Sequence, residues 1–315
     1  GLASDNHSRG SRVAHSDFRA QNVTAVKAVY QDDLTVDSNW MNNVKTNASY
    51  VLLFQSCGGQ MQVTANKIYT SNGASAMGLA DIAGTAQHPA VFANNMIVSN
   101  DDGRSVQLAT PLNIISARHT LIAYNSVKLV AGNRRNVATV TLGSGSGVLT
   151  DVRLVNNVIA CMDASNLALN YDSRSATNTT VGHNVYYSAG SVLNKYINTA
   201  CSSLAAWQTL YPSDSLSRVV EPAFLDGGLV DLRAYNPSIK GCGIPLTEVV
   251  TDMFGTSRDM HNPCAGALEF EALYYDFSIE SVSSPEAEYC SVPASIPLHV
   301  VLHNAGVRDY DPSTA

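Results

Sequence analysis

The chain has 315 residues, of which 45% are apolar and 14% charged, and its formal net charge at pH 7 is −7. The charged fraction is well below the roughly 25% of an average soluble domain, and Asn, Ser, Thr and Gly supply the polarity instead. Lysine and arginine form no stripe, which argues against nucleic acid as a partner. No apolar run approaches the length of about 18 residues that suggests a membrane span.

This composition favours a β-rich protein outside the cell or on its outer surface. The sequence starts at Gly1 without Met and without the apolar core of a signal peptide. We therefore expect a processed or excised segment, from which an export signal has been removed. We also expect it to be a monomeric segment of a longer multidomain protein.

The cysteines suggest disulfide bonds. An even number of cysteines without a C-x-x-C pair is typical of disulfides in an oxidising compartment. Cys242 and Cys264 flank one short segment and are the first candidate pair, and Cys161 with Cys201 is the second. The alternative is that the cysteines are buried thiols that act as small hydrophobic residues. The six cysteines are Cys57, Cys161, Cys201, Cys242, Cys264 and Cys290.

An internal repeat is the strongest pattern in the chain. Five segments share an asparagine between apolar residues, and the spacings between these asparagines are 29, 30, 32 and 27 residues. The segments are "MQVTANKIYTS", "AVFANNMIVSN", "TLIAYNSVKL", "VRLVNNVIAC" and "TTVGHNVYYS", and the aligned asparagines are Asn66, Asn95, Asn125, Asn157 and Asn184. A repeat of this length is typical of solenoids.

The residues around each asparagine predict a bend. Apolar side chains stand three residues before and two residues after it, as Phe92 and Ile97 do around Asn95. The alternation of a strand would place these two on opposite faces, so the chain must turn at the asparagine. We predict an all-β, right-handed parallel β-helix with asparagines stacked about 4.8 Å apart at its corners. Asn also tolerates the left-handed conformation of a corner. The alternative is a β-sandwich.

The ends of the chain depart from the repeat. Residues 1–33 form a frayed start or a remnant of earlier coils, and the coils proper span 34–198. Asn39 lies 27 residues before Asn66 and marks an earlier coil. From residue 199, "TACSSLAAWQTLYP" predicts a short helix with a Ser N-cap and a Pro stop.

Residues 199–271 carry motifs that resemble a known family. They are Glu221-Pro222-Ala223-Phe224, Asp231-Leu232-Arg233, Asn236-Pro237-Ser238-Ile239, Thr251-Asp252 with Gly255 and Arg258, and Gly266-Ala267-Leu268-Glu269-Phe270. They resemble bacterial, Bacteroidota-type parallel β-helix surface proteins with a choice-of-anchor Q type of C-terminal region. Glu221 replaces the usual Asp, and the closing segment carries Cys264. The resemblance implies export, surface display and closure of the solenoid end, with Asp252 and Arg258 paired across a turn.

Residues 272–315 differ in character from the preceding chain. The alternation in "DFSIESV" and "IPLHVVLHNAG" predicts two sandwich strands. The segment resembles the opening of an Ig-like or CARDB-like adhesion module.

An enzyme that cleaves polysaccharides is one functional hypothesis. A lyase needs a base and a cation that neutralises the uronate carboxylate, for which Lys128 and Arg153 on adjacent coils are candidates. Arg134 and Arg135 crowd one turn and are candidate ligands of an acidic glycan. The alternative is that these cations only solvate the outer faces.

A hydrolase would need two carboxylates at a defined separation. Asp101 and Asp163 both follow a repeat asparagine by six residues, two coils apart, which predicts a separation of about 10 Å. The turn from Asn100 to Gly103 could also bind Ca²⁺ through oxygen ligands, although an ordinary turn explains it better. The histidines, among them His119 and His183, show no metal-ligand spacing, so no other cofactor is expected.

A binding protein is the favoured hypothesis. Tyrosines near the late coils, among them Tyr171 and Tyr187, could stack on sugar rings, with His183 beside them. Tyrosine that fills the solenoid flank is the alternative. We therefore expect adhesin-like, non-catalytic recognition of glycan or of host or matrix ligands, with a polysaccharide lyase or glycoside hydrolase as the alternative. Charged side chains from adjacent coils that converge in a groove would favour the enzyme.

Overall fold

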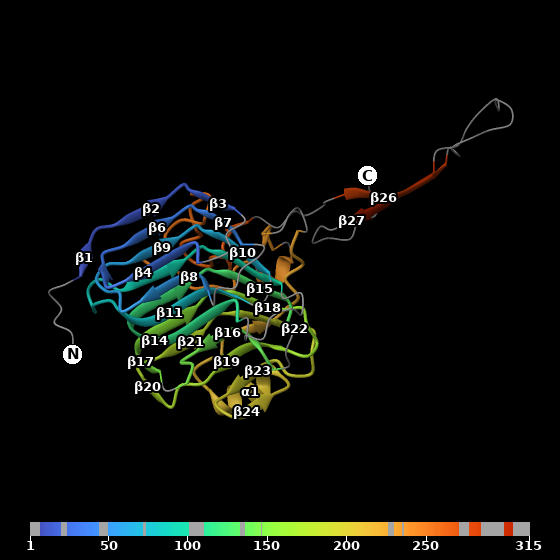
Figure 1. Cartoon of the computed structure of the whole chain (residues 1–315). Helices are drawn as coiled ribbons and strands as arrows, with labels where there is room; N and C mark the ends of the chain where they lie inside the picture. Colours follow the sequence, from blue (N-terminus) through green and yellow to red (C-terminus); the bar gives the residue numbers. More distant parts are fainter. Residues whose placement is uncertain are drawn as a thin grey trace. The chain divides into compact units, whose positions relative to one another are not determined.

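In the computed structural model, the chain forms two compact units, residues 1–269 and 270–315. The structure describes residues 7–19, 24–43, 50–71, 74–100, 110–132, 136–145, 147–225, 230–234, 236–270, 277–284 and 299–304. The first unit is a parallel β-solenoid of about five turns (Figure 1).

One wall of the solenoid is an eight-stranded parallel sheet, counted over the described residues. Its core-facing column contains Met41, Ile68, Ile97, Val127, Ile159 and Tyr186, all in register and all fully buried. The strands, in order across the sheet, are β3 (Asp17–Arg19), β7 (Trp40–Asn43), β10 (Lys67–Ser71), β13 (Met96–Asn100), β15 (Ser126–Ala131), β18 (Val158–Cys161), β22 (Val185–Ser188) and β25 (Arg218–Val219).

A fifteen-stranded sheet, again counted over the described residues, folds around the rest of the core. Its first face contains β2 (Arg12–Ala14), β6 (Thr35–Asp37), β9 (Gln62–Thr64), β12 (Ala90–Ala93), the ends of β14 (Leu112–Ala123) and β17 (Val148–Val155), and β21 (Thr180–Gly182). Its second face contains β4 (Val26–Val29), β8 (Tyr50–Gln55), β11 (Ser75–Ala83), the start of β14, β16 (Ala138–Leu142), β19 (Leu167–Tyr171), β23 (Asn194–Tyr196) and β24 (Thr199–Cys201). The short strands β1 (Ser8–Arg9), β5 (Gln31–Asp32) and β20 (Ser175–Thr177) lie at the corner between the two faces.

Stacked asparagines join the eight-stranded sheet to the first face of the other sheet. Asn39 and the five asparagines of the repeat are buried, with exposed fractions of 2% or less. Each donates from its side-chain nitrogen and its backbone N–H to the Oδ1 of the next, over 2.9–3.1 Å. Where no further Asn follows, Asn184 N–H donates to Ser217 Oγ at 2.9 Å. The other side-chain N–H donates to a backbone carbonyl of the preceding coil at 2.8–3.0 Å.

The left-handed corner conformation belongs to the residue before each ladder asparagine, which corrects the expectation from the sequence. Asn94, Tyr124, Asn156 and His183 have φ between 53° and 60°, and the ladder asparagines have negative φ. The physical reason is that the ladder residue must direct both its N–H and its side chain along the stack. The bend is therefore made one residue earlier, and that side chain points out of the solenoid.

The last coil ends on a buried polar cluster beneath helix α1 (Leu204–Leu210). Asp214 is fully buried and accepts bonds from Trp207 Nε1 at 2.7 Å, from the Tyr186 hydroxyl at 2.8 Å, and from the Ser217 hydroxyl. Ser203 caps the helix by accepting a bond from the Ala206 N–H. The cluster thus closes both the ladder and the core at this end.

From Ser217 onward the chain does not add a further full coil. It forms β25, the 3₁₀ turn η2 (Pro237–Ile239) and a long irregular segment that packs along the side of the solenoid. Within the described residues, no helix is long and apolar enough to span a membrane.

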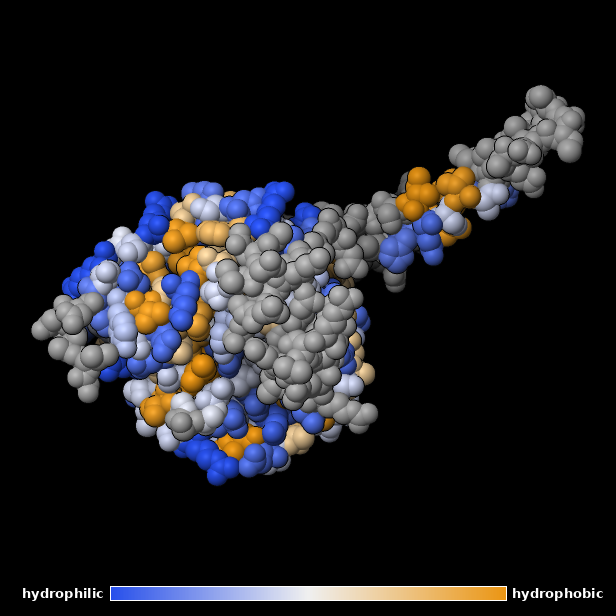
Figure 2. Space-filling view, in the orientation of Figure 1, coloured by the Kyte–Doolittle hydropathy of each residue, from blue (hydrophilic) through white to orange (hydrophobic). Residues whose placement is uncertain are grey.

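The second unit contains a two-stranded antiparallel sheet of β26 (Phe277–Ser284) and β27 (His299–Asn304). Ile279, Val282 and Leu302 are 64%, 53% and 59% exposed, and such apolar residues are visible on this hairpin in Figure 2. Two strands are too few to bury an apolar face by themselves. The rest of the predicted adhesion module lies outside the described residues.

The expected disulfides are absent from the described part of the chain. Cys161, Cys201 and Cys242 are buried, unbridged thiols, so neither predicted pair forms. Cys242 Sγ donates to Ile239 O at 2.9 Å, and burial raises the pKa of Cys161 to about 11. These cysteines serve as small hydrophobic residues, the alternative that composition left open. Cys290 lies outside the described residues.

Replacing Asn157 by Leu should destabilise the solenoid. The change removes the acceptor of two Asn125 N–H groups and the donor to Ile122 O and Asn184 Oδ1. We expect a loss of about 3 kcal/mol, because several buried partners are left unsatisfied. Chemical denaturation should detect it. The matched variant Asn198→Leu, in an exposed turn, should change stability little, and equal losses would contradict a special role for the ladder.

Asp214 should make the protein less stable as the pH rises. Burial raises the pKa of this carboxyl against the opposing effect of its three hydrogen-bond donors. In the unfolded chain Asp titrates near pH 3.9, so the native state binds more protons just above that value. The free energy of unfolding therefore falls from about pH 4 upward until the folded pKa is passed. Thermal unfolding at stepped pH should show this trend in the wild type and not in Asp214→Asn. A constant difference between the two proteins from pH 4 to 7 would contradict it.

Candidate functional site

The irregular segment 242–269, here called the strap, covers the corner that carries the asparagine ladder. The strap is bound by outward-pointing side chains that stand one residue before a ladder asparagine. Asn156 pairs with Ile244 in both directions, donating to its carbonyl at 2.8 Å and accepting from its N–H at 3.0 Å. The Tyr124 hydroxyl donates to the same carbonyl at 2.6 Å, and Asn94 donates to Thr251 O at 2.8 Å.

Arg258 is the central contact of the strap. It is 4% exposed, and its guanidinium lies 3.7 Å from the ring centroid of Tyr124. It donates to Asn94 Oδ1 at 2.7 Å and pairs with Glu269 at 3.4 Å. The expected pair with Asp252 is replaced, because Asp252 instead accepts backbone N–H groups of the strap, including that of Phe254 at 2.8 Å.

The strap also contacts two predicted site residues, the catalytic candidate Arg153 and the ligand-binding candidate His183. Arg153 forms an ion pair with Glu248 of the strap, and it is therefore not an open cation for a uronate. His183 Nδ1 lies 3.4 Å from Cys242 O, at the start of the strap. Lys128 is on the adjacent sheet, with its ammonium 5.6 Å from the Phe224 ring centroid. These residues do not converge on a common cavity.

The other predicted site residues are also dispersed. Asp163 accepts the N–H groups of Gly132 and Ser165 and so holds a turn. Tyr171 is 3% exposed in an aromatic cluster with Tyr196 and Tyr211, so it fills the core and is no platform for sugars. Tyr187 is half-buried on β22, in register with Ala160. Asp101, Arg134 and Arg135, with most of the Asn100–Gly103 turn, lie outside the described residues.

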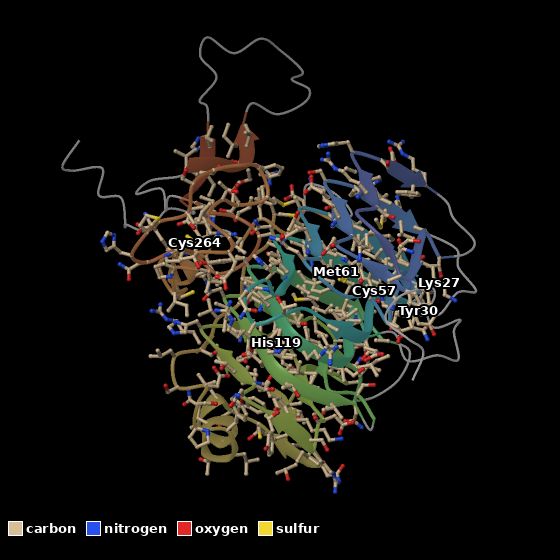
Figure 3. The ribbon with its side chains drawn as sticks, turned by 90° about the vertical axis from the view of Figure 1, so that its left-hand side faces the viewer. Lys27, Tyr30, Cys57, Met61, His119 and Cys264 are labelled. Atoms are coloured by element: carbon tan, nitrogen blue, oxygen red, sulfur yellow. The ribbon has the colours of Figure 1, made fainter. Side chains whose placement is uncertain are left out.

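A groove crosses the coils at a different corner, between the two faces of the fifteen-stranded sheet. Figure 3 shows Tyr30 and Cys57 of this region on one side of the solenoid and Cys264 of the strap on the other. Successive coils turn at this corner through a residue in the left-handed conformation. Examples are Tyr30, Ser56 and Asp81, with φ of 55°, 51° and 58°. The groove has a volume of about 760 Å³. We call it the corner groove.

The middle of the corner groove's floor lacks large side chains. Asp32, Gly58, Ala83 and Arg118 follow one another in register and point outward on successive coils. A Cβ atom at Gly58 would lie 2.8 Å from Asp32 Oδ1 and 3.1 Å from Ala83 O. Glycine and alanine thus leave a depression between an acidic residue at one end and a basic residue at the other.

The acidic end is held by a hydrogen-bonded pair. Asp32, whose side chain is 16% exposed, lies 2.8 Å from His7 Nδ1 and 3.7 Å from Arg9 Nη2. The ring of Tyr30 lies 5.5 Å from that of His7, and Tyr30 is 39% exposed. An aromatic ring and a carboxylate therefore stand side by side at the rim.

The middle and the far end of the groove carry two charged side chains, Asp81 and Arg118, that can still bind a ligand. Asp81 is exposed and accepts a bond from Ser56 Oγ at 3.3 Å, and its own N–H donates to Ser116 Oγ at 2.8 Å. Arg118 is also exposed, and neither it nor Asp81 has an ion-pair partner among the described residues. Next to Arg118, His119 Nδ1 lies 2.6 Å from Asp151 Oδ2.

The groove can offer a ligand both acceptors and donors. Asp32 and Asp81 can accept from hydroxyl groups, and the planar fork of Arg118 suits a carboxylate or a sulfate. The described residues contain no group of three His, Cys, Asp or Glu that could hold a metal ion.

Sequence reasoning missed the corner groove, because the residues of its floor share no chemistry. The column contains an acidic residue, a glycine without a side chain, a small alanine and a basic residue. What these four positions share is their register on successive coils: Asp32, Gly58, Ala83 and Arg118. A partial signal was present: Asp32, Gly58 and Arg118 stand seven or eight residues before the ladder asparagines Asn39, Asn66 and Asn125, whereas Ala83 stands twelve residues before Asn95.

Comparisons with known proteins add no relative. No protein-family model matches the chain, and no curated protein or solved structure matches it at a significant level.

Replacing Arg258 by Met should loosen the strap. The change leaves Glu269 and Asn94 Oδ1 without their partner and removes the contact with the Tyr124 ring. We expect a loss of about 3 kcal/mol and faster proteolytic cleavage within residues 242–269, because breaking a buried pair strands its other half. Mass spectrometry of limited digests locates the cuts. Arg174→Met, at an exposed position, is the control, and equal protection of the strap in both variants would contradict the assignment.

Proposed function

We propose that the protein binds a carbohydrate chain in the corner groove. The observation that carries the proposal is the groove itself, which crosses several coils over a floor formed by Gly58 and Ala83. A shallow channel across stacked coils fits an extended polymer better than a compact small molecule. The polar groups along it are of the kind that bind hydroxylated ligands.

The distribution of charge favours a chain with ionic substituents. Arg118 supplies an unpaired guanidinium, and Asp81 supplies an unpaired carboxylate among the described residues. Sugar carboxylates or sulfates would bind the first, and hydroxyl or ammonium groups the second. Tyr30 at the rim offers an aromatic face for a sugar ring.

We place this activity outside the cell or on its outer surface. The proposal is supported by the sparse charges of the chain and by the resemblance of residues 199–271 to choice-of-anchor Q type regions of bacterial surface β-helix proteins. An adhesin-like role would follow from binding without turnover.

Cleavage of a polysaccharide is the second candidate. It is favoured by the convergence of Asp32, Asp81 and Arg118 from several coils in one groove. Asp32 and Asp81 stand two coils apart, or about 10 Å along the stack, and Asp81 lies two residues before the position in register with Asp32. The separation along the stack alone is already close to the upper limit for two carboxylates that invert a glycosidic bond across a water molecule.

Binding and cleavage can be separated with one panel of polysaccharides. Acidic and neutral polymers are incubated with the full chain and assayed for binding, for an unsaturated product and for new reducing ends. We expect binding of an acidic polymer without cleavage. Release of product that Asp81→Asn abolishes would replace the first proposal by the second, and a panel without binding or cleavage would refute both.

Arg118→Ala should weaken binding of the acidic polymer at least tenfold, because a charge-assisted hydrogen bond is worth about 1.5–3 kcal/mol. Isothermal titration calorimetry measures the affinity, and thermal unfolding confirms that the variant is folded. Arg218→Ala removes an exposed arginine from β25, on the eight-stranded sheet and away from the groove, and should bind like the wild type. Equal affinity of both variants would show that the ligand binds outside the corner groove.

A further inference from the structure

A second cavity lies on the outer surface of the face formed by β8, β11, β14, β16 and β19. Its volume is about 360 Å³, and the described residues that line it are mostly polar. Those that matter here are Tyr50, Asn113, Thr141, Asn170 and Asp172. It is separate from the corner groove, with which it shares no lining residue among those described.

The ring of Tyr50 in this cavity packs against the backbone at Gly78. A Cβ atom at Gly78 would lie only 2.4 Å from Cε1 of Tyr50, so the ring lies directly against the backbone of β11. Its hydroxyl accepts a bond from Asn113 Nδ2 at 2.9 Å. A ring fixed at both its edge and its face is a preformed platform, which lowers the entropic cost of binding.

Beside the ring stands a column of polar side chains. Asn113, Thr141 and Asn170 are in register on successive coils. Asn113 Oδ1 and Asn170 Oδ1 are screened from solvent and have no hydrogen-bond partner among the residues that the structure describes. Buried acceptors without a donor are rare and costly, so these two oxygens require an explanation. A ligand hydroxyl would supply one after a rotation of the side-chain amide that brings Oδ1 to the surface of the cavity.

The spacing of these acceptors argues against a metal ion. The two residues stand two coils apart, or about 10 Å along the stack. A single Ca²⁺ needs all its oxygen ligands at about 2.4 Å, so it cannot serve both. Asp172 is the one carboxylate in the described lining, which contains no Lys or Arg. An anionic ligand would therefore find no described cation to bind.

We propose that this cavity is a second binding site, which takes an uncharged polyhydroxylated ligand, namely a unit of a neutral saccharide. One face of the sugar stacks on Tyr50, and hydroxyl groups at its two ends donate toward Asn113 and Asn170. The site does not depend on the corner groove, whose charged ends select a different saccharide.

Neutral hexasaccharides of glucose, mannose and xylose are the probes for this site. Calorimetry with the full chain should detect binding of at least one of them. Asn170→Ala should weaken that binding about tenfold, because it removes a hydrogen-bond partner in a desolvated site. Thr141→Val keeps the shape of the side chain and should also weaken binding. Thr177→Val, at an exposed position on the corner strand β20, should not.

Gly78→Ala tests the platform itself. The added methyl group must push the Tyr50 ring from its seat, so we expect loss of neutral-saccharide binding while thermal unfolding shows a folded protein. Arg118→Ala, in the corner groove, should leave this binding intact, which keeps the two sites distinguishable. The proposal is wrong if no neutral hexasaccharide binds, or if Asn170→Ala and Gly78→Ala both bind like the wild type. Ca²⁺ binding that Asn170→Ala removes would also overturn it.

Discussion

The structure depends on the geometry of one amide group, repeated once in each coil. An asparagine side chain has both donors and acceptors, so it can bond to the coil on each side at the same time. The distances of 2.9–3.1 Å along the ladder fix one coil upon the next. No apolar residue could do this, because apolar contacts set no direction. The core columns fill the interior, and the ladder determines their register.

The ladder also determines what the surface can do, because it forces the preceding residue into a left-handed conformation. That residue points outward and is free to vary from coil to coil. Asn94, Tyr124, Asn156 and His183 use this freedom to bind the strap. At the corner between the two faces of the fifteen-stranded sheet, left-handed positions such as Ser56 and Asp81 frame the corner groove instead. One backbone device therefore yields a closed side and an open side.

The solenoid could be predicted from sequence because its strongest constraint recurs at nearly constant spacing. The asparagine is the same residue in each coil, and the apolar residues around it reveal the bend. The left-handed position could not be assigned, because Asn, Tyr and His all occupy it. The strap was also hidden, since Arg258 and Asn94 are 164 residues apart and neither belongs to a motif with the other. The prediction that Tyr171 binds a ligand was wrong, because the sequence does not show whether a tyrosine is buried in the core or exposed on a flank.

Both candidate sites arise because the ladder residue is the same in every coil, whereas the outward residues in register on successive coils differ. Each such column presents one side chain per coil at a spacing of about 4.8 Å. A ligand that lies across the coils would therefore meet these side chains one after another. Charges stand at the ends of Asp32–Gly58–Ala83–Arg118, and under our proposal they would select ionic groups. The amides and the hydroxyl of Asn113–Thr141–Asn170 would select hydroxyl groups in the same way. Because the ladder keeps both spacings fixed, binding at either site should require little movement of the backbone, and the cost of ordering falls mainly on the ligand.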